Sequence, residues 1–463
     1  MEWDRLLCEV RIRDLYERPV VIDRPPEYRS QFERDYDRAV FSTPVRRLQD
    51  KAQVFPLEPH DAVRTRLTHS LEVSTVARDV ARQAGRWLAN ERYLTRPEQA
   101  HQIETIAATC GLIHDLGNPP FGHAGEQAIA GWCAELFEQE PERVEGWTEQ
   151  MKNDFLRFEG NAQTIRLVSK LQVLADDYGL NFTCGTLSAA CKYTAASHAV
   201  VKKGTGPHHA SKPGYFASEA ELVQRVRERT GTGEARNPIT YLVEACDDMV
   251  YSTVDLEDGV KKGVVDWQTV VKELMGAARE HVEPCLVWAD NYISRAAPPL
   301  RGLAYGEAMA QAFRTAVIAR VVPSVIEEFQ KNYRAIMEGA YPGELVRGCA
   351  AAPLVAACKQ FAACSVYCAH QTLQLELMGR RVIHDLMDLF WEAASTCDGS
   401  SGTKAFAGKA YALLSANYRS VFEKALEQKD TTAGYHRLQL VTDYVCGMTD
   451  TFACTLHRRL TNG

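Results

Sequence analysis

Four ionisable side chains stand in surroundings that suit a metal centre. His69 lies in RTRLTHSLEV, just ahead of an amphipathic segment. His114 and Asp115 end the apolar stretch ATCGLIHDLG, and Asp247 lies in EACDDMVYSTVDLEDG. Ionisable groups in such apolar settings are costly to bury unless they are paired or bind a metal. Two imidazoles and two carboxylates form a mixed donor set that suits Mn, Mg, Fe, Co or Ni, and the lack of thiolates argues against a closed structural zinc site.

A histidine–aspartate pair alone is a weak signal, because it is usually a hydrogen bond at a helix end. The chain contains a second such pair, His384–Asp385 in RRVIHDLMDL. That pair lacks the Gly-Asn-Pro-Pro stop that follows Asp115, and it has no matching partner. We therefore assign it to ordinary structure and treat the first pair as a functional hypothesis.

Three segments have the helical spacing needed to position these side chains. Apolar residues recur at this spacing over residues 71–88, 102–116 and 239–256. The second segment stops at residues 117–120 (Gly-Asn-Pro-Pro), and the third follows Asn237–Pro238, a good cap with a proline in the first turn. Because strand-like alternation is scarce, we expect an all-α fold with at most a minor β-hairpin near residues 200–217. Loops are expected at 202–214 and 397–404, which are rich in turn-forming residues.

The chain divides into three parts that are expected to pack as one body. We expect an N-terminal arm over residues 1–60 that contributes to the substrate pocket, a catalytic core over 61–260, and a helical C-terminal region over 261–463 for packing and oligomerisation. Residues 349–369 are rich in alanine and cysteine, which indicates tight helix packing and not a cofactor site.

Composition points to an ordinary soluble protein of a reducing compartment. The 463 residues are 46% hydrophobic, and the formal net charge is −7, so any site for a polyanion must be a local basic patch. The 14 cysteines are scattered and form no CxxC pair. No signal peptide is visible, and no uninterrupted apolar run is long enough to span a bilayer. We expect a cytoplasmic protein without a membrane partner.

Longer blocks of sequence resemble a known family. The blocks VRRLQDKAQVF, RTRLTHS, HDLGNPPFGHAGE, RFEGNAQ, KPGYFASE, DDMVYSTVDLEDG and DYVCGMTD occur in this order. In these blocks the chain resembles the HD-domain phosphohydrolases, and among them the bacterial deoxyguanosine triphosphate triphosphohydrolases (dGTPases). The resemblance implies hydrolysis of dGTP to the deoxynucleoside and intact tripolyphosphate, with a divalent metal held by His69, His114, Asp115 and Asp247. Mn or Mg is favoured as the metal, with Co, Fe or Ni as alternatives.

The resemblance also assigns catalytic and substrate residues. His123 and Glu126 match a catalytic pair, and their i, i+3 spacing at a helix start would place them on one face. Glu126 would orient His123, which would position the water or protonate the leaving 5′ oxygen. Gln53 and Asp255 match residues that hold the 3′-hydroxyl, while Tyr251 and Val54 would crowd the 2′ position. The remaining substrate-side matches are Arg66, Asn161, Lys192, Tyr193 and Lys212.

Other functions remain open at this stage. The chain could be a broad-specificity dNTPase, another HD phosphohydrolase or nucleotidase, or an HD protein that binds single-stranded nucleic acid. The acidic net charge disfavours DNA as the main ligand, and the four intact ligand positions disfavour a purely regulatory protein. By resemblance we expect single-stranded DNA as an effector and a homo-oligomer, with a hexamer favoured.

Overall fold

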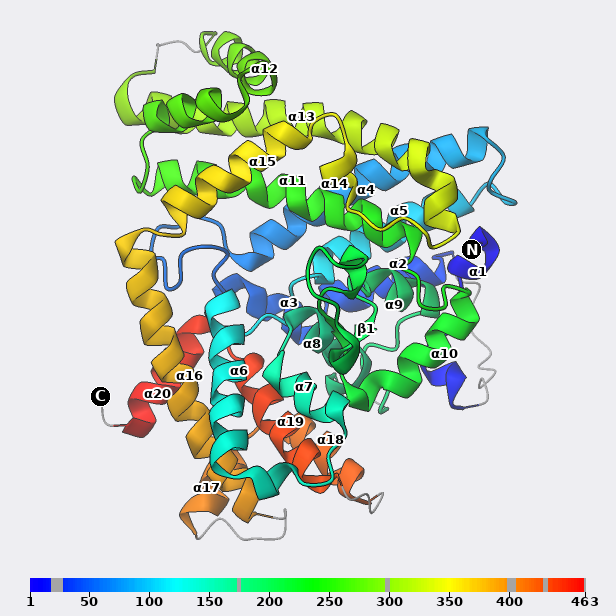
Figure 1. Ribbon diagram of the computed structural model, residues 1–463, viewed down its shortest axis with the longest axis vertical. Helices are drawn as coiled ribbons and strands as arrows, with labels where there is room; N and C mark the ends of the chain where they lie inside the picture. The colour runs from blue at the N-terminus through cyan, green and yellow to red at the C-terminus, as the bar shows by residue number, and fades with distance from the viewer. Residues whose placement is uncertain (18–27, 173–175, 296–299, 398–404, 428–431, 462–463) are drawn as a thin grey trace.

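The structure is a computed structural model that describes residues 1–17, 28–172, 176–295, 300–397, 405–427 and 432–461. Apart from Cys397, the loop expected over 397–404 lies outside these ranges. Helices dominate the described residues, which confirms the expected all-α class (Figure 1). The helices are α1 (Trp3–Leu6), α2 (Gln31–Val40), α3 (Thr43–Arg47), α4 (Arg66–Asn90), α5 (Gln99–Ile113), α6 (Gly122–Gln139), α7 (Glu149–Leu156), α8 (Gly160–Arg166), α9 (Cys184–Ala190), α10 (Ala220–Thr230), α11 (Pro238–Lys261), α12 (Trp267–Ile293), α13 (Gly302–Met337), α14 (Leu345–Gly348), α15 (Ala352–Phe361), α16 (His370–Thr396), α17 (Phe406–Leu413), α18 (Ala416–Glu427), α19 (Ala433–Cys446) and α20 (Asp450–Thr461).

The three helices expected around the site are present, each slightly longer or displaced at its ends. Segment 71–88 is the interior of α4, which begins earlier because the Thr65 side chain caps its first turn. Segment 102–116 is α5, which ends at Ile113, so that His114 and Asp115 fall in the turn that follows. Segment 239–256 is α11, capped by the Asn237 side chain, which accepts from the Ile239 amide at 2.9 Å.

The expected hairpin near 200–217 is wrong in its pairing. The two short strands, β1 (Ala195–Ala196) and β2 (Pro213–Tyr215), pair in parallel. A hairpin needs a tight turn between antiparallel strands, whereas parallel strands need a longer crossover. Here residues 197–212 form that crossover through two short 3₁₀ turns, so the Gly- and Pro-rich stretch is a connecting loop.

Two apolar cores meet along α5. One core is built mainly from α4, α11, α12, α13 and α15, and the other from α6, α8, α16 and α19. The two groups occupy the upper and lower parts of Figure 1. Helix α5 contributes Ile103 and Ile106 to the first core and Leu112 and Ile113 to the second. The residues directly after α5 therefore lie where the two cores join.

One described helix, α13, is long and apolar enough to cross a membrane by length and composition alone. No uninterrupted apolar run of that length occurs in the sequence, because Glu307, Arg314 and Arg320 divide the segment. The most apolar window of the helix is 56% buried. Helix α13 packs against α11 and α12, as a core helix does.

Candidate metal centre and substrate pocket

The four residues expected to bind metal converge from three helices. His69 lies in the first turn of α4, His114 and Asp115 directly follow α5, and Asp247 lies in the middle of α11. Ligand atoms of His69, His114 and Asp115 lie within 4.8 Å of one another. Oδ1 of Asp247 lies 3.2 Å from Nε2 of His69 and 3.4 Å from Nε2 of His114. The donors thus surround one point, although their role as metal ligands stays a prediction.

The orientation of His114 fits a metal ligand. Its Nδ1–H donates to the Gly111 carbonyl at 2.8 Å, which leaves the Nε2 lone pair directed toward the two carboxylates. That Nε2 is buried and makes no hydrogen bond of normal geometry. Buried polar atoms normally have partners, so an unpaired nitrogen among carboxylates is well suited to a divalent cation. The residues present therefore fit the expected metal.

Each carboxylate of the centre is held ionised by a basic side chain. Arg66 donates to Asp115 Oδ2 at 2.5 Å, and Lys192 donates to Asp247 Oδ2 at 3.2 Å. Burial raises the pKa of each carboxyl, but the neighbouring cations outweigh it and hold the pKa of both well below the ordinary value. Arg66 and Lys192, which the resemblance placed on the substrate side, therefore stabilise the charge of the two carboxylates that were expected to bind the metal.

Glycines allow two loops to cross beside the centre. A Cβ on Gly117 would lie 2.1 Å from the Gly160 carbonyl oxygen, and a Cβ on Gly160 would lie 2.3 Å from Asn118 Oδ1. Only residues without a side chain permit this approach. The crossing explains why the blocks GNPPFGHAGE and RFEGNAQ are both glycine-bearing, and it brings the start of α8 against the start of α6.

His123 and Glu126 form a hydrogen-bonded pair on the first turns of α6. Nδ1 of His123 lies 2.7 Å from Glu126 Oε2, and Glu126 Oε1 accepts from the Gly160 amide at 2.7 Å. Glu126 is buried, whereas the His123 side chain is 79% exposed. The hydrogen bond with Glu126 raises the pKa of His123 above its ordinary value. The geometry is that of a fixed carboxylate orienting a reachable imidazole.

A cavity of about 610 Å³ opens over the metal centre. This volume falls within the range of about 300–1,000 Å³ typical of small-molecule sites. Every residue predicted for the site lines it except Glu126, which lies behind His123. The predicted lining residues are Gln53, Val54, Arg66, His69, His114, Asp115, His123, Asn161, Lys192, Tyr193, Lys212, Asp247, Tyr251 and Asp255.

One wall of the cavity is a stripe along α11. Asp247, Tyr251 and Asp255 follow at intervals of four residues and share one helix face. Asp255 is 2% exposed, and its Oδ2 accepts from the Tyr367 hydroxyl while its Oδ1 has no partner. Burial raises the pKa of Asp255 to about 7. The Gln53 Oε1 atom is likewise buried and unpaired, so the cavity lining offers two unsatisfied acceptors.

Another part of the cavity lining is organised by Glu159, which the sequence analysis did not single out. Glu159 Oε1 accepts from Asn161 Nδ2 at 2.6 Å, and Oε2 lies 2.8 Å from Lys212 Nζ. The Lys212 ammonium lies 5.8 Å from the centre of the Tyr193 ring. Glu159 thereby fixes Asn161 and Lys212, two side chains that the resemblance placed on the substrate side. Its place inside the block RFEGNAQ was the available signal.

The C-terminal region also contributes to the cavity, which the sequence did not indicate. Lys359 lies 2.9 Å from Asp248 Oδ1 and 4.8 Å from the centre of the Tyr251 ring. Tyr367 contacts Asp255, and Thr372 and Glu376 line the cavity one helical turn apart on α16. No motif surrounds these residues, because they meet the catalytic helices only through long-range packing.

Asp450, in the C-terminal region, holds the N-terminal arm and the start of α6 beside the pocket. Its Oδ2 accepts from the Ala52 amide at 2.9 Å, and its Oδ1 accepts from the Phe121 amide at 3.0 Å. Ala52 precedes Gln53, and Phe121 takes a left-handed conformation (φ 63°) just before α6. Lys51 donates to the Cys446 carbonyl at 2.9 Å beside this junction. One buried carboxylate therefore fixes the backbone next to Gln53 and two residues before His123.

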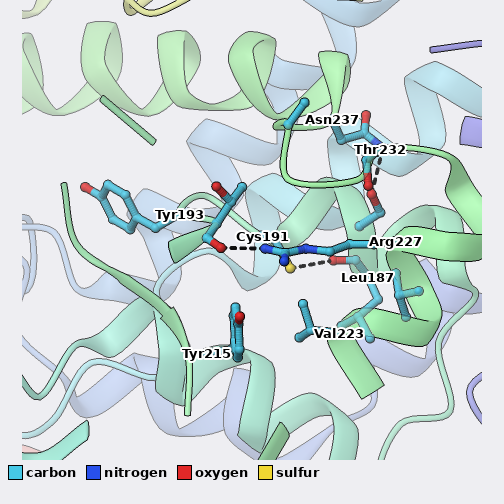
Figure 2. A pocket seen from close by; sticks show the side chains of 12 residues that line it. Leu187, Cys191, Tyr193, Tyr215, Val223, Arg227, Thr232 and Asn237 are labelled. Carbon is cyan, nitrogen blue, oxygen red and sulfur yellow. Dashed lines mark hydrogen bonds between the residues drawn. The ribbon is translucent and has the colours of Figure 1, made fainter. Parts of the chain in front are cut away.

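A second cavity shares Tyr193 with the first but is of a different kind. Figure 2 shows it between Tyr193, Tyr215 and Arg227. Its volume of about 20 Å³ has room for about one water molecule. The Arg227 guanidinium lies over the Tyr215 ring at 5.3 Å and donates to the Thr194 carbonyl. The small cavity is a gap between the packed side chains that surround Tyr193.

Comparison with known proteins agrees with this arrangement. Residues 66–171 match the HD domain, and residues 349–459 match the phosphohydrolase-associated domain. A deoxyguanosinetriphosphate triphosphohydrolase-like protein of Listeria innocua is 37% identical over 470 residues, which cover 99% of each chain. The deoxyguanosinetriphosphate triphosphohydrolase of Serratia proteamaculans is 32% identical over 505 residues, which cover 96% of each chain. A similar protein of Synechocystis is 32% identical over 472 residues, which cover 99% of each chain. The resemblance seen in the sequence is confirmed: the chain belongs to the deoxyguanosinetriphosphate triphosphohydrolase family of HD-domain phosphohydrolases.

Proposed function

We propose that this protein hydrolyses dGTP, and to a lesser extent other dNTPs, to the deoxynucleoside and tripolyphosphate in a metal-dependent reaction. The observation that carries the proposal is a single cavity that joins a His-His-Asp-Asp centre to basic side chains and to two unpaired acceptors. A triphosphate needs positive charge around its phosphates, and a deoxyribose offers one secondary hydroxyl as a donor. Different residues of the one cavity lining supply these two features.

His69, His114, Asp115 and Asp247 would hold the divalent cation, for which Mn or Mg is our first choice. When bound, the cation supplies Lewis-acid polarisation and charge neutralisation at the reacting phosphoryl group. Arg66 and Lys192 keep Asp115 and Asp247 ionised, so the centre stays ready to bind the cation. Lys212 and Asn161, fixed by Glu159, would contact the phosphates.

His123 would protonate the 5′ oxygen as it leaves the α-phosphorus. Glu126 holds the imidazole in one orientation and raises its pKa, so that a larger fraction carries the required proton near neutral pH. The exposed edge of His123 faces the cavity, where the leaving oxygen would lie. A water molecule would attack the α-phosphorus while the bond to the 5′ oxygen breaks. The proton that the water loses would pass to solvent, and the His123 imidazole would regain a proton from solvent, so that the net products are the nucleoside and tripolyphosphate.

The sugar and base would lie along α11 and the start of α16. The 3′-hydroxyl would donate to Asp255 Oδ1 or Gln53 Oε1, both of which lack a partner. Tyr251 would close the space beside the 2′ carbon, with Val54 opposite. Beyond them, Glu376 would accept from the N1–H and N2–H groups of guanine, and the buried Thr372 hydroxyl has no partner of its own. Only guanine presents two adjacent donors on that edge.

A substrate panel with product identification tests this function. The four dNTPs and GTP are incubated separately with the protein and Mn²⁺ or Mg²⁺, and the products are separated by ion-exchange chromatography. We expect deoxyguanosine and tripolyphosphate from dGTP, with a Glu376→Gln variant losing preference for guanine. Release of pyrophosphate or inorganic phosphate would instead place the cleaved bond elsewhere and refute the proposal.

We further propose a homo-oligomer, a hexamer by preference, with single-stranded DNA as an effector. The effector proposal rests on family resemblance, and the net charge of −7 requires any binding groove to be a local basic surface. A titration with single-stranded oligonucleotide at several salt concentrations tests it, because phosphate contacts weaken steeply with salt. Unchanged dGTP turnover at saturating oligonucleotide would contradict this role.

A further inference from the structure

We propose that His208, Glu244 and Glu344 form a second site for a divalent cation, distinct from the centre around His114. Their ligand atoms lie within 4.8 Å of one another. His208 Nε2 lies 3.5 Å from Oε1 of Glu244 and 3.5 Å from Oε1 of Glu344. These three residues come from a 3₁₀ turn (His208–Ala210), from α11 and from the residue before α14, so tertiary structure alone brings them together.

The two carboxylates are buried, and an arginine already pairs with each of them. The side chains of Glu244 and Glu344 are 3% and 9% exposed, and that of His208 is 17% exposed. Arg236 pairs with Oε2 of Glu244, and Arg347 pairs with Oε2 of Glu344. The Oε1 atoms both face His208, although Arg236 also reaches Oε1 of Glu244 at 3.3 Å. Each carboxylate thus keeps one oxygen directed at a common point.

The backbone around the three residues favours a formed site. The His208 amide donates to the Pro342 carbonyl at 3.0 Å, which ties the 3₁₀ turn to the segment that carries Glu344. Little side-chain or backbone freedom is therefore lost when a cation binds.

The donor set defines the class of ligand. One imidazole and two carboxylates suit a transition-metal dication such as Mn²⁺ better than Ca²⁺, which prefers oxygen ligands only. All three residues line the large cavity, so further coordination positions are open toward it. If the proposed function holds, the outer phosphates of a nucleotide are the natural ligands for those positions. The binding of the cation itself does not depend on that function.

Mn²⁺ binding without nucleotide tests the site. Free Mn²⁺ is measured by electron paramagnetic resonance during titration of the wild type, His69→Ala, His208→Ala and the double variant. We expect about two Mn²⁺ per chain for the wild type, about one for each single variant, and about none for the double variant. His198→Ala, a change at an exposed histidine nearby, should leave the wild-type value unchanged.

The outcomes separate this site from the catalytic centre. If the wild type and His208→Ala bind the same number of ions, the second site is refuted whatever happens to turnover. Failure of the catalytic assignment would show instead as an unchanged value in His69→Ala. A Glu344→Gln variant, with its fold checked by circular dichroism, guards against unfolding as the cause of lost binding. Retention of the second Mn²⁺ in that variant would also overturn the proposal.

Discussion

At the scale of single residues, the centre is a balance between buried carboxylates and fixed cations. Asp115 and Asp247 would be costly to bury alone, and Arg66 and Lys192 offset that cost in the folded protein. The Gly111 carbonyl sets the tautomer of His114. These contacts exist without a metal in place, which means that binding a cation does not need to build the site.

Asp115→Ala is expected to abolish both metal binding and dGTP turnover while the protein stays folded. The variant removes one ligand, and it leaves Arg66 at the centre without its partner, which repels a cation. Metal content by mass spectrometry, turnover and circular dichroism give the three readouts. Asp385→Ala in the second His-Asp pair is the matched control, because Asp385 bonds His457 far from the cavity. Full activity of Asp115→Ala would show that Asp115 is not part of the metal site.

His123→Ala should lower turnover by about 10²–10⁴-fold and leave metal binding intact, because general acids typically contribute that much. The pH profile gives a sharper test. An acid is active while protonated, so activity persists below the pKa of His123 and falls as the pH rises through it. Glu126 raises that pKa, so Glu126→Gln should move the alkaline limb of kcat to lower pH.

Glu135→Gln, an exposed change farther along α6, serves as the control and should leave the limb in place. If the alkaline limb of kcat does not move in Glu126→Gln, the limb belongs to a group other than His123. Loss of the metal in His123→Ala would mean that His123 is itself a ligand.

At the scale of elements, α11 carries the residues that we propose for the metal, the sugar and the second cation site. Its period places Asp247, Tyr251 and Asp255 in one line, and Glu244 lies three residues before Asp247. The line is completed from outside the helix by Tyr367, which bonds Asp255, and by Lys359, which lies over Tyr251. One helix thus sets the spacing between Asp247, the proposed metal ligand, and Asp255, the proposed sugar contact.

The stripe along α11 predicts how the protein distinguishes deoxyribose from ribose. An apolar pocket alone rejects an added hydroxyl by only about 10²-fold, so stronger rejection of GTP needs the wall at Tyr251. Tyr251→Ala should therefore admit GTP, whereas Asp255→Ala should lower kcat/KM for dGTP because the 3′-hydroxyl loses an acceptor. The kcat/KM values for dGTP and GTP measure both effects. Tyr28→Ala, at a tyrosine that is 97% exposed and does not line the cavity, should change neither value. A wild type that uses GTP and dGTP equally would defeat this model.

Asp450 is expected to act as a positioning residue between elements. Asp450→Asn keeps the shape but can accept only one of the two amide hydrogen bonds, so one buried amide loses its partner at a cost of about 1–3 kcal/mol. Because Ala52 adjoins Gln53, we expect KM for dGTP to rise while metal binding is retained. Chemical denaturation and Michaelis parameters check this.

The control for that change is Asp50→Asn, since Asp50 accepts from Thr451 at the surface of the same junction and asparagine can still accept there. Equal effects of the two variants on KM would mean that the junction has no special role.

At the scale of the whole molecule, two cores share α5, and one end of the fold exposes apolar side chains. Val287, Trp288 and Tyr292 on α12 are 55%, 45% and 56% exposed, and the two aromatic rings stack at 5.3 Å. Helix α12 lies at the upper edge of the molecule in Figure 1. Contiguous exposed apolar side chains are typical of interaction surfaces.

We expect the protein to assemble with copies of itself, because closed symmetric assemblies are the common case for soluble oligomers. Light scattering coupled to gel filtration should give a mass several-fold above the 51.7 kDa of one chain, with a hexamer as the expected state. A Trp288→Glu variant tests whether α12 takes part. A monomer at micromolar concentration would contradict the assembly.

The sequence by itself determined the helices and the local groups that carry chemistry. Helical periodicity, the cap at Asn237 and the stop after Asp115 act within one or two turns, so they predicted α4, α5 and α11 and the placement of His114 and Asp115 at a helix end. Family resemblance then marked His123, Tyr251 and Asp255, all of which line one cavity.

Only the tertiary structure decided the contacts made across long separations in the chain. The parallel pairing of β1 with β2 depends on a crossover whose path no local pattern fixes. Tyr367 and Lys359 reach α11 from more than a hundred residues away, and the His208–Glu244–Glu344 cluster needs three separate elements. Such contacts follow from how two cores pack around α5, and packing leaves no periodic trace at the residues that it brings together.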